Sequence, residues 1–450
     1  MAQGHGRFYH LFIYPIAQAP YLLDSLAVVN FSRILSSGLV QVAYFGFVRE
    51  LFGVRLALLS GFLFLGLFNT VGGSYNPFHG LPFWFNIGMG FVLASYWAYA
   101  RCRRLGRSQR MAYLLFFAAL LTYEVMIVYA VGFALMHFAL ADARADAREG
   151  RARRFLRGES GLILVVGTYI ALYLGFRYFF PGSYEGARQL SIGPWQDITR
   201  TIWNFSISGV YVRLPTRIEA VVWRPLLYAA AVAIGLTLTW RYVPHARARL
   251  GAGATIVVLA VTMFAFAPNL LFGFTERYRA WGERFYLASY YAAFAICLAL
   301  AVAVERMREW SASPWRPAVL IFLLASFSMA AYANQVQSLR FYDESRRDAF
   351  RWRAMDALAR AILESEWSVS RVCTKSFIER EDPYDYWSYY LTRRIGKPVA
   401  VLVRDPKDAS CDVHVVLERD GGAMTLRMAR TVGANESSTG GSLTTILRSR

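Results

Sequence analysis

Long apolar runs alternate with short polar segments through the first 333 residues of the chain. Apolar stretches of about 17–25 residues are long enough to cross a bilayer as helices. The pattern predicts an all-α polytopic membrane protein with about ten crossings. They span about residues 27–48, 54–70, 82–100, 111–123, 125–140, 160–180, 224–240, 253–271, 285–304 and 317–333.

The segment from Met111 to Leu140 is apolar almost throughout, has Tyr123 and Glu124 near its middle, and is flanked by arginine runs at both ends. Short arginine-rich loops stay in the cytoplasm, so we expect this segment to enter the membrane and return as a hairpin. Tyr123 and Glu124 then lie at or near its tip. The alternative is one long tilted helix with Glu124 buried against a partner such as an arginine. A carboxylate at membrane depth is costly, which makes Glu124 a functional-site candidate.

Two predicted crossings carry residues that interrupt an apolar helix. Pro82 opens the third crossing, Asn86 lies within it, and Pro268-Asn269 lies near the end of the eighth. Breaks at membrane depth are tolerated where the backbone lines a cavity or is buried in protein. Ordinary helix kinks are the alternative explanation.

Beyond residue 333 the composition becomes polar. Residues 334–365 have apolar positions near helical spacing, and the runs KPVAVLVRD, CDVHVVLER and AMTLRMAR read as strands. We therefore divide the chain into an interfacial segment (1–26), a transmembrane domain (27–333), an amphipathic helix with a small α/β domain (334–433) and a disordered tail (434–450). The arginine bias of the loops predicts that both ends of this sequence, and with them the α/β domain, lie outside the cytoplasm. There, Cys373 and Cys411 could form a disulfide.

The composition excludes a soluble globule and a nucleic-acid-binding protein. Apolar residues make up 56% of the chain and charged residues 18%, with a net charge of +19. The basic residues cluster at the ends of apolar runs, where they report orientation and contact with anionic headgroups. No basic stripe with interleaved aromatics occurs, so we expect a lipid bilayer and no nucleic acid as a partner.

Two outer loops, 181–223 and 273–284, depart from the rule that arginines stay inside, and the second is the candidate site. This second loop follows the eighth crossing and combines aromatic residues with three arginines and two acids: Arg277, Arg279, Arg284, Glu276 and Glu283. Arginine is the preferred side chain for phosphate, through paired charge-assisted hydrogen bonds. The alternative is an interfacial belt of arginines and aromatics that binds lipid headgroups.

Taken together, these features resemble a known family. Gly6-Arg7-Phe8 precedes the first crossing, the short-helix pair carries Leu121-Thr122-Tyr123-Glu124, an arginine-rich outer loop follows Pro268-Asn269, and an outer domain closes the chain. The pattern is similar to the bacterial GT-C superfamily of integral membrane glycosyltransferases. The resemblance implies an inner-membrane enzyme that moves a sugar from a polyprenyl-phosphate carrier to a glycan or lipid acceptor on the outer side.

The resemblance also implies roles for the candidate residues. Glu124 is the acceptor-binding group or general base, held by Tyr123 or Arg7. Arg277, Arg279 and Arg284 bind the leaving phosphate beside Glu276 and Glu283, and a divalent metal is the alternative source of positive charge. No side chain is assigned as a metal ligand.

The chain departs from this family at its start. Members are most alike in an acidic residue or pair that follows a first helix, and neither precedes Gly6-Arg7-Phe8 here. The chain is then a truncated member, has a misplaced start, or works without that acid. Asp24 is the nearest carboxylate, although its position suits a cap of the following helix.

Three other functions share much of this pattern. A flippase or other transporter of lipid-linked saccharides would have the same crossings and a buried Glu124. An O-antigen polymerase or ligase would also have large arginine-rich outer loops. An inactive relative is the third alternative, because the acid expected near the start is missing.

Overall fold

The computed structural model describes most of the chain. The described residues are 12–13, 16, 19, 26–68, 82–140, 155–156, 158–180, 193–207, 210, 223–244, 269–270, 273–276, 279, 287–310, 316–365, 368–374, 386–402, 411–420, 423–430 and 442–448. The chain divides into two compact units, Met1–Leu339 and Arg340–Arg450. The first is helical, and the second contains a small sheet.

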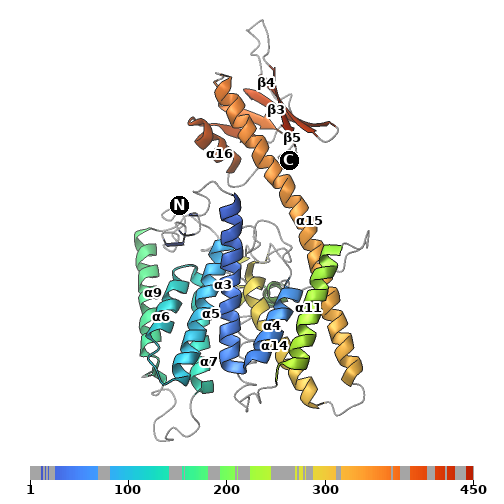
Figure 1. Cartoon of the computed structure of the whole chain (residues 1–450). Coiled ribbons are helices and arrows are strands. Elements are labelled where there is room, and N and C mark those ends of the chain that lie inside the picture. Colours follow the sequence, from blue (N-terminus) through green and yellow to red (C-terminus); the bar gives the residue numbers. More distant parts are fainter. Residues whose placement is uncertain are drawn as a thin grey trace. The chain divides into compact units, whose positions relative to one another are not determined.

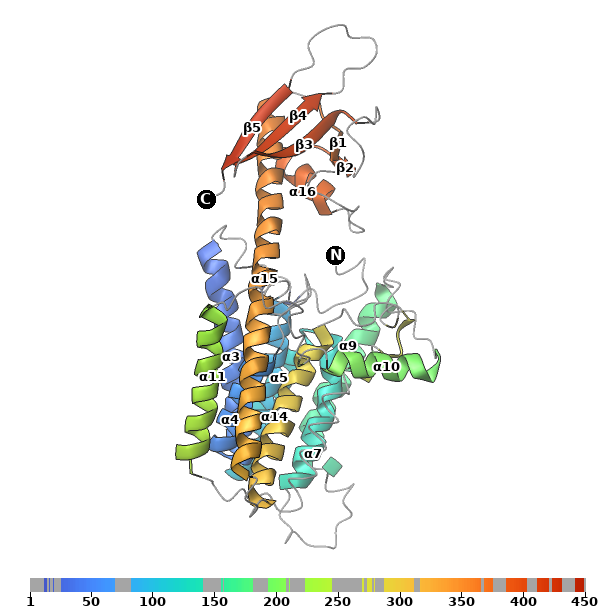
Figure 2. The same ribbon diagram turned by 90° about the vertical axis from the view of Figure 1, so that its right-hand side faces the viewer.

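Helices make up the first unit. They are α3 (Leu26–Phe52), α4 (Val54–Leu67), α5 (Pro82–Arg104), α6 (Arg110–Leu120), the 3-10 helix η2 (Glu124–Tyr129), α7 (Ala130–Leu140), α9 (Ser160–Phe179), α10 (Trp195–Ile207), α11 (Trp223–Tyr242), α14 (Leu287–Trp310) and the start of α15 (Arg316–Glu364). The long helices run side by side in both views (Figures 1 and 2), and Figure 2 shows α10 lying across their direction. Helices thus occupy every predicted crossing that falls within the described residues.

Gly53 is the single residue between α3 and α4. Its φ of 94° lies in a region that side chains with a Cβ rarely adopt, and its N–H donates to Arg49 O at 3.0 Å. The helix therefore ends there, and the chain turns directly into α4, which packs against α3.

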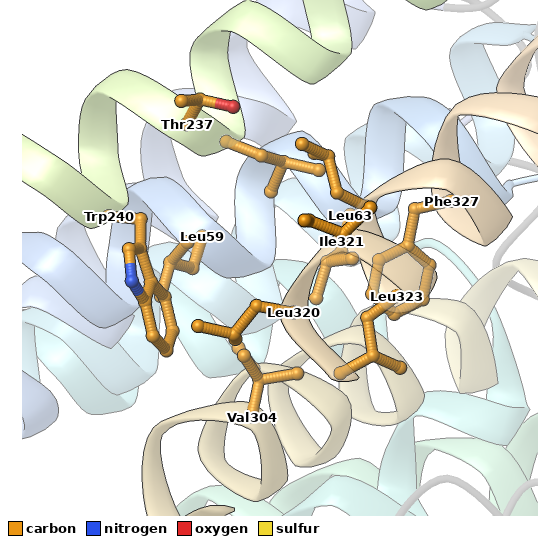
Figure 3. Close-up of a pocket in the computed structure, with 12 residues that line it drawn as sticks. Leu59, Leu63, Thr237, Trp240, Val304, Leu320, Ile321, Leu323 and Phe327 are labelled. Carbon is orange, nitrogen blue, oxygen red and sulfur yellow. The ribbon is translucent and has the colours of Figure 1, made fainter. Parts of the chain in front are cut away.

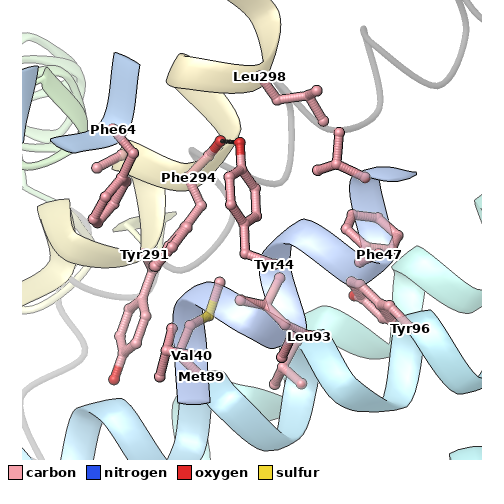
Figure 4. Packing of buried hydrophobic residues seen from close by; sticks show 14 of the residues in the cluster. Val40, Tyr44, Phe47, Phe64, Met89, Leu93, Tyr96, Tyr291, Phe294 and Leu298 are labelled. Carbon is pink, nitrogen blue, oxygen red and sulfur yellow. Dashed lines mark hydrogen bonds between the residues drawn. The ribbon is translucent and has the colours of Figure 1, made fainter. Parts of the chain in front are cut away.

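An aromatic core lies between α3, α4, α5 and α14. Phe64 and Phe294 stack with ring centroids 4.3 Å apart, and the Tyr44 hydroxyl donates to Phe294 O at 3.0 Å. Figure 4 shows Tyr44 and Phe294 beside side chains from α5 such as Met89. Aromatic side chains bury large areas and prefer such tilted and stacked pairs, so this cluster fixes four helices against one another.

The first unit carries membrane-type helices. Three are long and apolar enough to cross a bilayer: Asn30–Phe52, Ser160–Phe179 and Pro317–Val336. Shorter apolar helices cover Val54–Leu67, Arg110–Leu120 and Glu124–Phe138. Large apolar side chains stand exposed on α9, including Leu164 at 70%, which suits lipid rather than water.

The predicted eighth crossing, residues 253–271, lies outside the described residues apart from 269–270. The helix α15 continues without a break through residue 334, where the composition changes. A change from apolar to charged composition therefore marks a change of environment along one helix, and does not end it.

The second unit is a five-stranded sheet with helices packed on it. Strands follow the order β2-β1-β3-β4-β5, with bounds β1 Arg371–Thr374, β2 Ala400–Leu402, β3 Val413–Asp420, β4 Ala423–Arg430 and β5 Ser442–Arg448. The strand β1 pairs in parallel with β2 and β3, and β3, β4 and β5 pair antiparallel. Val372 and Val413 pack with Leu358 of α15 and Leu391 of α16 (Tyr386–Ile395).

Two features of this unit concern residues for which the sequence predicts a structure. Cys373 and Cys411 form a disulfide with their Cα atoms 5.9 Å apart, within the usual range. The strand β5 lies in residues 434–450, for which composition predicts disorder. That prediction is wrong for Ser442–Arg448, because the run SLTTILR contains β-branched residues and pairs along its length with β4.

Candidate functional site

The segment predicted as a hairpin does reverse direction. The helix α6 ends at Leu120, residues 121–123 form a turn, and η2 leads into α7. Tyr113, in the first turn of α6, and His137, in the last turn of α7, both bind the carboxylate of Glu159. The first turn of α6 and the last turn of α7, both remote from Tyr123 and Glu124, therefore lie together, and the alternative of one uninterrupted helix is wrong.

Glu159 closes this hairpin from a fully buried position at the start of α9. Its oxygens accept hydrogen bonds from the hydroxyls of Tyr99 and Tyr113 at 2.6 and 2.7 Å, and lie 2.6 Å from His137 Nδ1. Because a carboxylate can only accept, Nδ1–H of His137 donates to Glu159; Arg103 Nη2, itself a donor, lies farther away, at 3.4 Å from the same nitrogen. We call Glu159, Tyr99, Tyr113 and His137 the Glu159 clamp.

The Glu159 clamp has a structural role in this geometry. A buried carboxylate is stable when hydrogen-bond donors surround it, and these donors come from α5, α6 and α7. Glu159 has no solvent-exposed surface for a substrate to contact. Glu159 was not among the candidates predicted from the sequence, although its position between an arginine run and an apolar run is a visible signal.

Tyr123 and Glu124 lie at the closed end of the hairpin. Tyr123 is buried in an extended conformation, and Glu124 begins η2 and is half-buried. The Glu124 carboxylate lies within electrostatic range of the Tyr169 hydroxyl on α9. Tyr291 of α14 interacts in the same way with Tyr123. Glu124 and Tyr123 thus lie among tyrosines from two other helices, which the sequence did not indicate.

Two glycines determine how closely the hairpin approaches α5. A Cβ at Gly88 of α5 would lie 2.6 Å from Thr122 Oγ1, and a Cβ at Gly132 of α7 would lie 2.1 Å from the Tyr96 hydroxyl. Gly88 is sixteen residues from Arg104, or about 24 Å along the helix. The hairpin tip therefore lies far from the arginine-rich end of the bundle.

A buried polar cluster lies on α5 half a turn from Gly88. The Asn86 amide donates to Ser36 and Ser37 of α3 at 3.3 and 3.1 Å, and its oxygen accepts from the Tyr290 hydroxyl at 2.7 Å. Asn86 therefore joins α3, α5 and α14 with its polar groups satisfied. This explains how a residue that interrupts an apolar run fits inside the bundle.

The predicted phosphate-binding residues are described only in part. Arg7, Arg277, Glu283 and Arg284 lie outside the described residues. Glu276 is exposed, and Arg279 is half-buried and donates from Nη1 to Gly273 O at 3.0 Å.

The segment around Arg279 lies against α10. A Cβ at Gly193 would lie 2.8 Å from the Arg279 guanidinium carbon, and the Asn269 amide donates to Ser206 Oγ at 2.7 Å. The helix α10 buries Phe205, exposes Trp203, and packs against α14. Tyr291, which interacts with the hairpin, also belongs to α14. This helix is therefore the common support of the hairpin and of α10.

An apolar cavity of about 210 Å³ lies between α4, α11, α14 and α15 (Figure 3). Its lining includes Leu63, Trp240 and Phe327, and it suits a hydrocarbon chain. Arg55 stacks over Trp240 at 5.0 Å, and its Nε lies 2.5 Å from Glu305 Oε1. This cavity therefore belongs to the arginine-rich half of the bundle, whereas Glu124 lies toward the other half.

The candidate site is thus the hairpin tip with its tyrosines, supported by the Glu159 clamp below and the Asn86 cluster beside it. A half-buried carboxylate among tyrosine hydroxyls can bind a hydroxyl group and accept its proton. Arg279, beside Gly193, and Trp203 of α10, which packs against α14, are of the side-chain types that can bind a phosphate and a sugar face. No family model, curated protein or solved structure matches this chain.

Proposed function

We propose that this chain is an integral membrane glycosyltransferase that moves a sugar from a polyprenyl phosphate to a cell-envelope acceptor on the outer side of a bacterial inner membrane. The observation that carries the proposal is the interrupted hairpin, which holds the Glu124 carboxylate at the end of the bundle opposite the arginines. A membrane helix broken at a carboxylate is costly to build, and such groups are functional by default. The likeness to the GT-C pattern supplies the reaction.

In the proposed reaction, groups at this end of the bundle take the following roles. The acceptor hydroxyl attacks the anomeric carbon while the bond from that carbon to the phosphate oxygen breaks, with inversion. Glu124 takes the hydroxyl proton, and the leaving polyprenyl phosphate keeps the electron pair. Arg279 supplies positive charge to that phosphate, with Arg277 and Arg284 as further candidates from the sequence.

The proposed orientation places the arginine-rich end in the cytoplasm, with ten crossings. Contacts between helices support this orientation, because they join those ends of the helices that carry arginines. Arg104 Nη2 lies 2.7 Å from Glu50 Oε1, and Arg55 Nη1 donates to Val243 O at 3.1 Å. Successive helices thus return to one arginine-rich end, as the positive-inside rule requires.

The test is a transfer assay in proteoliposomes that contain the full chain and polyprenyl-phosphate sugars. We expect release of free polyprenyl phosphate in the presence of acceptor. Glu124→Gln should lower the rate about 10²–10⁴-fold, the usual contribution of a general base. The matched control is Glu50→Gln, another carboxylate of the same bundle, which should keep the rate within about twofold because it lies at the opposite end.

Two outcomes count against the proposal. Full activity of Glu124→Gln would remove that residue from the reaction. A wild-type chain that moves lipid-linked saccharide between leaflets without consuming it is a transporter, for which a broken helix at a buried carboxylate is equally suited. The two activities are separated by measuring, in the same vesicles, the polyprenyl phosphate released and the saccharide exposed on each face.

A further inference from the structure

Three side chains with metal-binding atoms meet in the second unit. The sulfur atoms of Cys373 and Cys411 and a ring nitrogen of His414 all lie within 4.8 Å of one another. All three residues are buried, with exposed fractions of 0%, 2% and 9%. Within the described part of the chain, this is the one group of three or more histidine, cysteine or acidic residues close enough to share a metal ion.

Strand register brings these residues together. In the parallel pair β1–β3, Cys373 lies opposite His414. Side chains alternate between the two faces of a sheet, so Val372, Val413 and Val415 point into the helix-covered core and Cys373 and His414 share the other face. Cys411 precedes β3 by two residues, and its sulfur reaches Cys373 from the end of the neighbouring strand.

One ring nitrogen of the His414 imidazole lacks a hydrogen bond to any residue that the structure describes. Its Nδ1 is buried and has no hydrogen-bond partner among the described residues. Buried polar side-chain atoms nearly always have a partner, so an imidazole nitrogen left without one beside two sulfurs calls for an explanation. A structural disulfide alone needs no imidazole at this position.

We propose that Cys373, Cys411 and His414 form a metal site that opens and closes with the oxidation state of the two cysteines. In the oxidised state the sulfurs are joined, and no metal binds. A dithiol reductant transfers two electrons and two protons to the disulfide and becomes a disulfide itself. The two cysteines then bind a metal as thiolates and release their protons, with His414 as the third ligand.

The donor set selects the metal class. Two thiolates and one imidazole are typical ligands of Zn²⁺, and they also suit Cu⁺. Tetrahedral zinc with Zn–S of about 2.3 Å and Zn–N of about 2.0–2.1 Å separates its ligand atoms by about 3.5–3.8 Å. Starting from atoms within 4.8 Å, the reduced site reaches this geometry with side-chain rotations. Zinc would complete its shell with a water, whereas Cu⁺ accepts three ligands.

The experiment measures metal binding by the full chain in detergent micelles, before and after reduction with a phosphine that is then removed. Cys102 and Cys297 are the two cysteines outside this pair, so the test uses a Cys102→Ser/Cys297→Ala background. We expect one Zn²⁺ per reduced chain and none per oxidised chain. Substitution by Co²⁺ should give the thiolate-to-cobalt absorption band, and a competition with Cu⁺ identifies the preferred ion.

His414→Ala should weaken binding about tenfold or more, because even loss of an outer partner of a metal ligand costs ~10–100-fold. Cys373→Ser should abolish the cobalt band. Circular dichroism shows whether the unit is folded in each oxidised variant that keeps both cysteines. Cys373→Ser is left out of this comparison because it cannot form the disulfide. Equal zinc affinity of the reduced chain and its His414→Ala variant would overturn the proposed ligand set. Failure of the reduced, folded chain to bind either metal would overturn the site altogether.

Discussion

His137 Nδ1 lies 2.6 Å from Glu159 Oε1, and this contact joins the last turn of α7 to the residue that begins α9. Tyr113 binds the other oxygen of the same carboxylate from the first turn of α6. One buried side chain therefore holds both ends of the hairpin. Because α6 has a fixed length, fixing its end also fixes how far the tip with Glu124 reaches into the bundle.

Glu159→Ala should destabilise the first unit by about 2–4 kcal/mol. The substitution leaves three buried donors, on Tyr99, Tyr113 and His137, without their acceptor, and each such loss costs about 0.6–1.7 kcal/mol in membrane helices. Glu159→Gln retains one acceptor oxygen and should cost less. Unfolding in mixed detergent micelles measures the difference. Equal stability of Glu159→Ala and wild type would show that the Glu159 clamp does not hold the hairpin.

The buried pair Arg55–Glu305, which joins α4 to α14 in the arginine-rich half of the bundle, gives a second prediction. Each side chain is about 95% buried, so removal of one partner leaves an uncompensated charge. Arg55→Ala or Glu305→Ala alone should each destabilise the unit by about 3–5 kcal/mol. The double variant should lose less than the sum of the two single losses.

A double-mutant cycle on the same unfolding measurement checks this. Arg55→Lys is the matched control, since it keeps the charge but loses the second nitrogen that donates to Val243 O. It should fall between wild type and Arg55→Ala. Additive single losses would mean that the two side chains do not interact.

The helical part of the fold follows from sequence because burial in lipid and burial in protein both require apolar helices. Each predicted crossing within the described residues is a helix for this reason. The position of Tyr123 and Glu124 at a reversal followed from the arginines at both ends of the segment. Charge counts report on which side a loop lies, so they identified the reversal without any knowledge of packing.

The partners of Glu124 and Tyr123, which are Tyr169 and Tyr291 respectively, could not be predicted in the same way. Tyr169 and Tyr291 come from helices more than forty residues away in sequence, and tyrosine in an apolar helix usually reads as an interfacial anchor. The Glu159 clamp depends on α5, α6, α7 and α9 meeting at one point. The pattern of residues along a sequence shows helix periodicity and charge, but it does not show which helix faces pack against one another.

Gly88→Ala should displace the hairpin tip. Its Cβ would lie 2.6 Å from Thr122 Oγ1 and 2.9 Å from Met126 Cε, so η2 must move away from α5. Overpacking of this kind costs about 1–3 kcal/mol, which outweighs the gain in helix propensity from alanine. Hydrogen exchange of the amides in residues 121–129 should become faster. Gly61→Ala is the control, because a Cβ there meets nothing within 4 Å and should stabilise α4.

The second unit should lose stability in acid through Asp412. Its carboxylate accepts from the Ser370 hydroxyl and N–H, both at 2.7 Å, and from the Arg371 N–H at 2.8 Å. Burial by itself raises the pKa of Asp412, but the hydrogen bonds from Ser370 and Arg371 outweigh it and hold the pKa below its usual value. The folded state therefore binds this proton less readily than the unfolded state. The resulting stabilisation is present above the unfolded pKa of about 3.9 and is lost as the pH falls through the folded pKa.

Asp412 is half-buried, so solvent screening limits the effect to about 0.5–1 kcal/mol. Asp412→Asn should lower stability at pH 7 and flatten its dependence on pH below about 4, measured by thermal unfolding of the full chain at a series of pH values. Ser370→Ala keeps the carboxylate but removes one donor, so it should shift the loss of stability to higher pH. A Ser370→Ala profile that coincides with wild type would show that the Ser370 hydroxyl does not lower the pKa of Asp412. An Asp412→Asn profile that coincides with wild type would assign the acid sensitivity to other carboxylates.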